Sequence, residues 1–153
     1  MIIEGWLNKD LHSFLEKEFL YSTPHYYGHK SGAEGKNVFY NTTLNQEDPM
    51  IRFLSYKLQK TLNNKLIFHR TYINIQHPKM NGDFHQDEGN FTCLYMVTGN
   101  GNFEIQNEKV IEFKKDKLIC FDSKKFHKGL APDEGVRITL TFKTTNTGEK
   151  YNV

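Results

Sequence analysis

The sequence lacks several features that define whole classes of proteins. It has only two cysteines and no C-x-x-C pair, so we expect neither a disulfide framework nor a cysteine-based zinc site. No apolar run approaches the length of a membrane span, and the first residues lack the basic start and apolar stretch of a signal peptide. We therefore expect a cytoplasmic protein without a membrane partner.

An excess of one charge is also missing. Twenty Lys and Arg against eighteen Asp and Glu leave a net charge of +2, and the basic residues form no long run. Composition therefore gives no electrostatic case for nucleic-acid binding. Internal repeats, low-complexity tracts and linkers are absent as well, and 153 residues suit one folding unit. We predict a single domain over residues 1–153 and leave its oligomeric state open.

Two amphipathic segments in the first third of the chain predict helices. Asn8 is a candidate N-cap for LHSFLEKEFL, whose apolar residues recur at helical spacing. Asp48 and Pro49 supply a cap and a first-turn proline for MIRFLSYKLQKTL, which Asn63 should end. Residues 21–44 follow neither the helical nor the strand period, so we predict a long loop there. Its aromatic side chains could shape a substrate groove or simply pack on the barrel.

From Lys65 onward the pattern changes to short runs of β-branched and aromatic residues separated by turn residues. The candidate strands are LIFHRTYINI, FTCLYMV, NFEIQ, KVIEF, LICF and VRITLTF. Strands at this spacing with no helix between them predict an antiparallel barrel or sandwich of the jelly-roll type. We expect a mainly β fold with N-terminal helices, divided into a helical part over 1–64 and a β-barrel core over 65–143. Cys93 and Cys120 lie in two of these strands and should be buried free thiols.

A candidate metal site begins at His85 and Asp87. On an extended segment, residues two apart point the same way, so this imidazole and this carboxylate can converge on one metal ion. Asp83 is a rival carboxylate by the same parity, and an H-x-D sequence can also be a plain surface turn. His127 follows the strand LICF, whose end could deliver a second imidazole to the same point. Two imidazoles and one carboxylate form the facial triad of Fe(II) oxygen chemistry, although His127 alone could be an ordinary loop histidine.

A candidate anion site lies in the strand VRITLTF. Arg137 and Thr139 share one face of that strand with Thr141, while apolar residues occupy the other face. The turn chemistry of residues 131–135 can fold this strand back beside the segment that carries His127. A guanidinium can hold a carboxylate with two charge-assisted hydrogen bonds. The alternative is an edge-strand arginine paired with one of two glutamates, Glu104 or Glu112.

Taken in order, these residues resemble a known family. An H-x-D sequence, a downstream histidine, and an arginine nine intervening residues later in an R-x-T strand look like the Fe(II)/2-oxoglutarate-dependent oxygenases. Within them the chain is most similar to the prolyl 4-hydroxylase-like branch, including small versions common in marine phages. The resemblance runs from about Arg70 to Phe142 and is carried by RTYINI, FHQDEGNFTCLYMV, GNGNFEI, LICFDSKKFHKG and DEGVRITLTF.

The resemblance implies a double-stranded β-helix, which is the cupin-like jelly roll. It implies a dioxygenase that uses O2 to hydroxylate an unactivated C–H bond, with a peptidyl proline as the leading substrate and, for a viral protein, the host cytoplasm as its compartment. The resemblance implies that the Fe(II) ligands are His85, Asp87 and His127. It also implies that Arg137, with Thr139 beside it, binds the distal carboxylate of the cosubstrate 2-oxoglutarate. Further cosubstrate contacts are expected from two sets of residues, Tyr72, Asn74 and Gln76 on one strand, and Leu94 and Met96 on the next.

A competing interpretation belongs to a different functional class. A metal-binding cupin-like module or an isomerase could use the same barrel without 2-oxoglutarate. Arg137 separates the two interpretations, because only the oxygenase needs a cationic anchor opposite the metal. A catalytically silent interaction domain ranks last, because all three candidate metal ligands are present.

Overall fold

Antiparallel strands are the main secondary structure of the computed structural model, which describes residues 1–152. In chain order the elements are β1 (Ile2–Glu4), α1 (Lys9–Lys17), the π-helical turn η1 (Glu18–Ser22), β2 (Tyr26–Lys30), β3 (Val38–Thr43), α2 (Pro49–Leu62), β4 (Leu66–Gln76), β5 (Phe91–Thr98), β6 (Phe103–Ile105), β7 (Lys109–Ile111), β8 (Lys117–Asp122), β9 (His127–Gly129) and β10 (Arg137–Asn146). A major sheet has the strand order β1-β8-β5-β10-β4-β3-β2, and a minor sheet has the order β7-β6-β9. The predicted mainly β fold with N-terminal helices is confirmed.

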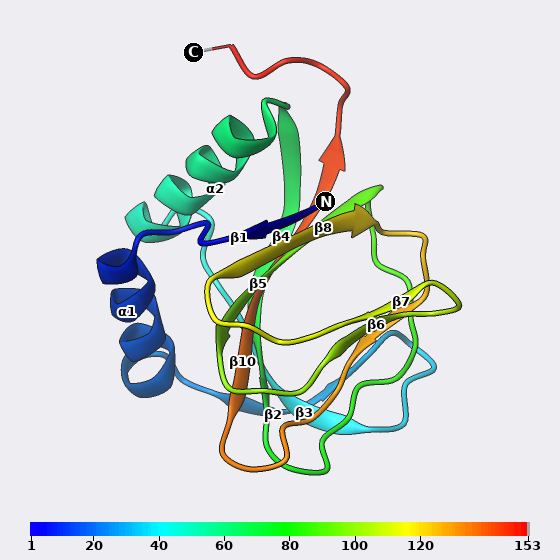
Figure 1. The fold of residues 1–153 in the computed structure, drawn as a ribbon. Helices are drawn as coiled ribbons and strands as arrows, with labels where there is room; N and C mark the ends of the chain where they lie inside the picture. The colour runs from blue at the N-terminus through cyan, green and yellow to red at the C-terminus, as the bar shows by residue number, and fades with distance from the viewer. Residues whose placement is uncertain (153) are drawn as a thin grey trace.

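The major sheet separates the helices from the minor sheet (Figure 1). Its central strand β10 pairs with β4 on one side and β5 on the other, and both faces of β10 are buried. Ile138 and Leu140 lie in the core beneath the helices, whereas Arg137 and Thr139 lie in a cavity toward the minor sheet. The two-residue period of a strand therefore divides β10 into a structural face and a candidate functional face.

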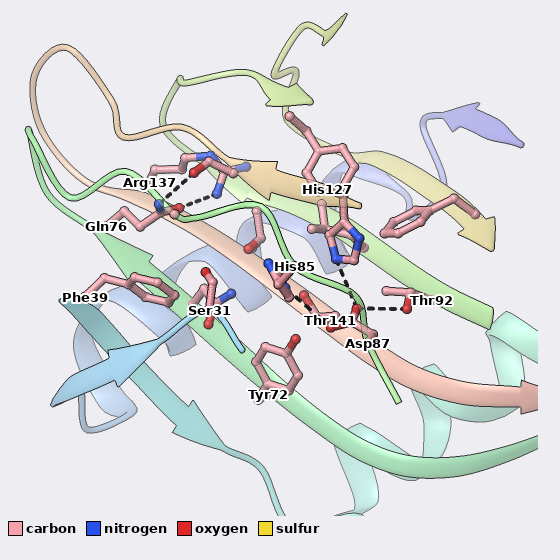
Figure 2. A pocket seen from close by; sticks show the side chains of 17 residues that line it. Ser31, Phe39, Tyr72, Gln76, His85, Asp87, Thr92, His127, Arg137 and Thr141 are labelled. Carbon is pink, nitrogen blue, oxygen red and sulfur yellow. Dashed lines mark hydrogen bonds and ion pairs between the residues drawn. The ribbon is translucent and has the colours of Figure 1, made fainter. Parts of the chain in front are cut away.

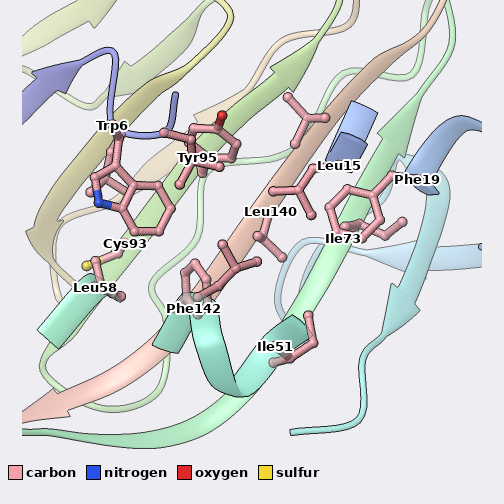
Figure 3. Close-up of a cluster of buried hydrophobic side chains, with 14 of the residues drawn as sticks. Trp6, Leu15, Phe19, Ile51, Leu58, Ile73, Cys93, Tyr95, Leu140 and Phe142 are labelled. Atoms are coloured by element: carbon pink, nitrogen blue, oxygen red, sulfur yellow. The ribbon is translucent and has the colours of Figure 1, made fainter. Parts of the chain in front are cut away.

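The larger hydrophobic core joins the helices to the major sheet (Figure 3). Leu15 from α1 and Leu58 from α2 are fully buried together with Ile73 and Phe142 of the sheet. Burial of a side chain of this size contributes about 1.5–3 kcal/mol to the free energy of folding. A second cluster, which includes Leu94, Met96, Phe103, Ile111 and Phe121, fills the space between the two sheets. These two cores hold the sheets at the spacing that the cavity requires.

Both predicted helices are confirmed, including their caps. The side chain of Asn8 accepts a hydrogen bond from the backbone N–H of Leu11 at 2.8 Å. The side chain of Asp48 accepts one from Met50 at 2.9 Å, and α2 ends where Asn63 adopts a left-handed conformation with φ 51°. Among the described residues, no helix is both long and apolar enough to cross a membrane.

The predicted loop over residues 21–44 is wrong, because β2 and β3 form a hairpin there and β3 pairs with β4. The division into a helical part over 1–64 and a barrel over 65–143 also needs correction. Three strands from the first part join the major sheet, and β10 runs on to Asn146. These strands are short and lie at or near the sheet edges, so their stability comes from partners distant in sequence. Local periodicity therefore gave no signal for them.

Candidate metal and cosubstrate site

Three side chains from two separate segments meet in the cavity between the sheets (Figure 2). His85 and Asp87 precede β5, and His127 begins β9. The backbones of His85 and His127 form an antiparallel bridge, with N–H to carbonyl distances of 3.1 and 3.0 Å. One ligand atom from each of the three side chains lies within 4.8 Å of the other two. The structure thus brings together the residues that the sequence singled out as metal ligands.

Both imidazoles are oriented by backbone carbonyls. Nδ1 of His85 lies 2.9 Å from the carbonyl of Asp83, and Nδ1 of His127 lies 2.8 Å from the carbonyl of Lys125. Because a carbonyl can only accept, each Nδ1 must carry a proton and donate it. The Nε2 atoms then face Asp87, at 3.5 Å for His85 and 3.2 Å for His127. This is how a protein fixes the tautomer of a metal-binding histidine.

Asp87 is buried but remains ionised. Thr92 donates a hydrogen bond to its Oδ2 at 2.9 Å, and Nζ of Lys143 lies 3.2 Å from its Oδ1. Burial by itself would raise the pKa of Asp87, but its contacts with His127 and His85 and the charge of Lys143 hold the pKa well below the usual range. The carboxylate is therefore in the form that binds a cation. A divalent metal would bind between this carboxylate and the two Nε2 atoms, in contact with all three side chains.

Asp83, the rival carboxylate, has a different role. Its Oδ2 accepts hydrogen bonds from the backbone N–H groups of Lys36 and Asn37, both at 2.9 Å. Its Oδ1 accepts another from the side chain of Asn37 at 3.2 Å. Asp83 thus anchors the loop between β2 and β3, and it is absent from the cluster of candidate metal ligands.

Arg137 is buried in the same cavity with one nitrogen unused. Nη1 donates to Oε1 of Gln76 at 2.6 Å and Nε donates to the carbonyl of Gly101 at 3.0 Å, whereas Nη2 has no hydrogen-bond partner among the described residues. Burial lowers the pKa of Arg137 to about 9, so the guanidinium stays charged at neutral pH. The alternative of an edge-strand arginine is wrong, because β10 is central and Glu104 pairs instead with Lys128. A buried, charged and partly unpaired guanidinium fits an anionic ligand.

The cavity beside Arg137 has polar groups that suit a carboxylate-bearing ligand such as 2-oxoglutarate. Its empty volume is about 400 Å³ with its open mouth included. The buried hydroxyls of Thr139 and Thr141 line this cavity, and neither has a hydrogen-bond partner within residues 1–152. Four other residues expected at the cosubstrate also line it, namely Tyr72, Asn74, Gln76 and Leu94. Met96 does not, because it packs in the second core, where its sulfur accepts the N–H of Lys114.

Gly129 leaves space for the guanidinium. A Cβ atom at this position would lie 2.9 Å from Nη1 of Arg137, closer than real side chains allow. The turn over residues 131–135 carries the chain from β9 in the minor sheet to β10 in the major sheet, so these two strands lie in different sheets. As the sequence predicted, Arg137 lies beside the segment that carries His127 and lines the same cavity.

Several cavity residues were missed by sequence reasoning. Lys143 has the same strand parity as Arg137, so extending the predicted strand by one residue would have placed it on the functional face. Ser31 and Phe39 line the cavity from the segment that was predicted to be a loop. Thr92 is the second residue of the strand FTCLYMV, and nothing in the sequence marked it as a site residue. Four of the remaining histidines contact other residues away from the triad, and these are His12, His25, His69 and His77.

No protein-family model and no curated protein sequence matches this chain. Solved structures do match. A viral collagen prolyl hydroxylase from Paramecium bursaria Chlorella virus-1, solved in complex with 2-oxoglutarate, is 17% identical with a TM-score of 0.68 over 95% of each chain. A prolyl hydroxylase from Trichoplax adhaerens, in complex with a peptide fragment of the hypoxia-inducible factor oxygen degradation domain, is 14% identical with a TM-score of 0.70, over 97% of this chain and 84% of that one.

A cupin-like protein from Thermotoga maritima aligns less fully. It is 12% identical with a TM-score of 0.53, over 83% of this chain and 86% of that one. The two prolyl hydroxylases therefore share more of the architecture, since the alignment with them takes in nearly the whole chain. At these identities the likeness concerns the fold, and the fold is the jelly roll that oxygenases and cupin-like proteins have in common.

Proposed function

We propose that this protein is an Fe(II)- and 2-oxoglutarate-dependent dioxygenase that hydroxylates an unactivated C–H bond. One observation carries the proposal. The set of His85, Asp87 and His127 shares a cavity with Arg137, a buried cation whose Nη2 has no partner among the described residues. A metal site explains the first group, and an anionic ligand such as a carboxylate explains the second.

One end of the cavity would bind the metal, and the other end would bind the distal carboxylate of 2-oxoglutarate. The two Nε2 atoms and the carboxylate of Asp87 would hold Fe(II), and a set of three protein ligands would leave it able to bind 2-oxoglutarate and O2. The fork of Arg137, fixed by Gln76 and the carbonyl of Gly101, holds the distal carboxylate of 2-oxoglutarate. When bound, the iron and 2-oxoglutarate supply the oxidising chemistry with O2, and the cosubstrate leaves as succinate and carbon dioxide.

Aromatic rings close the cavity around the metal ligands. Phe121 lies edge-on to His127 with ring centroids 4.7 Å apart, and Phe103 lies 5.6 Å from the same imidazole. Both belong to the second core, so water is excluded from that side of the site. Exclusion of water strengthens the electrostatic interaction of Arg137 with the carboxylate of 2-oxoglutarate and limits side reactions.

A prolyl residue in a peptide is the substrate to test first. The support is the sequence resemblance to prolyl 4-hydroxylases, together with the likeness in fold to a prolyl hydroxylase that was solved with a peptide. The competing candidate, a cupin-like metal protein without 2-oxoglutarate, is supported by the fold alone. It gives no reason for the unpaired Nη2 of Arg137 or for the unpaired hydroxyls of Thr139 and Thr141.

The decisive experiment titrates 2-oxoglutarate calorimetrically into Mn(II)-loaded protein, with Mn(II) as an inert stand-in for Fe(II). Arg137→Lys keeps the charge and loses the fork, and Arg137→Met loses both. Loss of charge-assisted hydrogen bonds should weaken 2-oxoglutarate binding roughly tenfold to a hundredfold, with Mn(II) affinity nearly unchanged. Arg52→Met, on the exposed face of α2, is the matched control and should bind as wild type does.

Two results would end the proposal. Wild-type protein that fails to bind millimolar 2-oxoglutarate is not an oxygenase of this kind, even if the metal site proves correct. Variants of Arg137 that bind 2-oxoglutarate as tightly as wild type would remove the cosubstrate assignment. Succinate formation in the absence of a primary substrate, with and without Fe(II), gives an independent readout of turnover.

A further inference from the structure

A second hollow opens beside the metal ligands, at the Lys143 end of β10. We call it the outer groove, and its empty volume is about 620 Å³ with its open mouth included. Residues from β2, β3, β4 and β10 line it, and it adjoins the cosubstrate cavity, with which it shares Ser31, Phe39, Tyr72, Asn74 and His85. Lys143 lies six residues along β10 from Arg137, which corresponds to about 20 Å of strand. Lys143 therefore marks the end of the groove that lies away from the cosubstrate arginine, next to Asp87.

The outer groove is lined by cations and, among the residues that the structure describes there, by no acid. Lys30, Arg70 and Lys143 supply three positive charges. Arg70 and Lys143 are direct cross-strand partners in the pairing of β4 with β10. Like charges at directly opposed positions destabilise a sheet unless something compensates them. Arg70 and Lys143 therefore repel each other across the two strands.

Arg70 is held in place without an acidic partner. Its Nε and Nη2 donate to the hydroxyl of Thr43 at 3.0 and 2.9 Å, and Nη2 also donates to the side-chain carbonyl of Asn41 at 2.7 Å. Its guanidinium lies 4.4 Å from the ring centroid of Tyr72, and Nζ of Lys143 lies 5.4 Å from the same centroid. None of the ion pairs among the described residues involves Arg70. The Arg70 guanidinium is therefore held in a fixed position, and no acidic side chain among the described residues pairs with its charge.

The pKa of His29 is consistent with a positive electrostatic potential in the outer groove. His29 lines the outer groove from β2, and burial together with the charges of Arg70 and Lys143 lowers its pKa to about 4. Burial is the largest cause of this shift, and the charges of Arg70 and Lys143 lower the pKa further, as expected beside a positively charged groove. The same potential would attract an anion.

Binding of metal and cosubstrate increases this imbalance. In the described structure the carboxylate of Asp87 compensates Lys143 at 3.2 Å. In the proposed enzyme, Asp87 and one carboxylate of 2-oxoglutarate would neutralise the divalent metal, and Arg137 would take the other carboxylate. Lys143 would then share Asp87 with the metal, and Arg70 would have no anionic partner among the described residues.

We propose that the outer groove binds an anionic group of the primary substrate, a carboxylate or a phosphate, through Arg70 and Lys143, so that the enzyme acts on acidic substrates. This inference rests on the proposed oxygenase function, because it takes the groove to be the substrate side of the metal. A planar guanidinium and an ammonium that flank one aromatic ring offer several donors to one anionic group. A neutral substrate would leave both charges uncompensated.

The test measures binding of small probes to protein loaded with Zn(II), a diamagnetic stand-in, and saturated with 2-oxoglutarate. The probes are N-acetylaspartate, its neutral counterpart N-acetylasparagine amide, and inorganic phosphate, each followed by NMR through the side-chain resonances of Arg70 and His29. We expect at least one anion to bind at least about tenfold more tightly than the neutral probe. Whichever of the two anions binds more tightly shows whether the groove prefers a carboxylate or a phosphate.

Variants then assign the binding to the groove. Arg70→Gln should lose most of the anion affinity, and Lys143→Gln should do the same through the other cation. Arg52→Gln, which removes an equal charge from the exposed face of α2, should keep that affinity. Thermal unfolding and 2-oxoglutarate affinity of each variant confirm that it is folded. The comparison of charged and neutral probes on wild-type protein stands even if a variant does not fold.

The outcomes are separable. If 2-oxoglutarate fails to bind the Zn(II)-loaded protein, the proposed function fails. If 2-oxoglutarate binds but neither anion exceeds the neutral probe, the acidic-substrate inference is overturned and the oxygenase proposal survives. If the anion binds equally well to wild type, Arg70→Gln and Lys143→Gln, its site lies elsewhere and the inference is again overturned.

Discussion

Nζ of Lys143 lies 3.2 Å from Oδ1 of Asp87, although the two residues come from β10 and from the segment before β5. The lysine side chain is only 16% exposed and the carboxylate only 1%. A buried carboxylate needs a cationic partner to remain ionised. In the metal-free protein Lys143 is such a partner, so the lysine and a divalent metal compete for the same carboxylate.

Replacing Lys143 with Met should therefore destabilise the metal-free protein but strengthen metal binding. We expect the metal-free protein to lose about 1–3 kcal/mol of stability, because a buried charge loses a charge-assisted contact. Mn(II) should bind severalfold more tightly, because its competitor is gone. Urea unfolding without metal and calorimetric titration of Mn(II) measure the two effects, with Lys150→Met on the exposed C-terminal segment as the control. Weaker Mn(II) binding would show that Lys143 supports the metal instead of opposing it.

The metal ligands can be separated from their neighbour Asp83 by single substitutions. His85→Ala and His127→Ala each remove one Nε2 from the triad and should abolish Mn(II) binding in the micromolar range. Asp83→Ala loses contacts with Lys36 and Asn37, so it should loosen the loop between β2 and β3 and leave Mn(II) affinity close to normal. Equal loss at Asp83, or no loss at His127, would contradict the assignment.

Gly129→Ala tests whether the position of the Arg137 guanidinium controls the cosubstrate. The new Cβ would lie 2.9 Å from Nη1 and must displace it. We expect 2-oxoglutarate to bind at least about tenfold more weakly to the Mn(II)-loaded variant, with little change in Mn(II) affinity. In an Arg137→Met background the same substitution should have almost no further effect, which a double-mutant cycle measures. Additive losses would show that Gly129 acts on something other than Arg137.

The two cysteines should be reduced. Cys93 and Cys120 lie directly opposite each other in the pairing of β5 with β8, and both are buried and free. Burial, with the neighbouring Cys120, raises the pKa of the Cys93 thiol, so it should react slowly with alkylating reagents in the folded protein. Mass spectrometry of protein denatured and alkylated without reductant should find two modified thiols. A disulfide would argue against the cytoplasmic compartment expected from the sequence.

His29 gives the stability of the protein a specific pH dependence. Its pKa in the folded protein is about 4, below the ordinary value of 6.5. The unfolded chain therefore takes up the proton first as the pH falls, and His29 lowers the free energy of unfolding progressively from about pH 6.5 toward pH 4. His29→Asn should show a flatter dependence over this window. Arg70→Gln should raise the pKa of His29 measured by NMR, and an unchanged pKa would contradict the account of the groove potential.

The sequence alone determined the local elements and the order of the site residues. Asn8 and Asp48 cap the two helices because their side chains bond backbone N–H groups only a few residues away. The alternation along VRITLTF placed Arg137 and Thr139 on one face because a strand has a period of two at any position in a fold. These features depend on short stretches of chain, so a single sequence reveals them.

Tertiary structure decided which of the equivalent side chains became functional. Asp83 and Asp87 have the same strand parity and the same charge, so the sequence does not distinguish them. In the folded protein, Asp83 binds backbone N–H groups of the loop between β2 and β3, whereas Asp87 faces two imidazoles. The cross-strand pair of Arg70 and Lys143 exists because β10 lies against β4, a register fixed by packing of the whole barrel. Contacts between residues more than seventy positions apart depend on long-range pairing, and no local pattern encodes them.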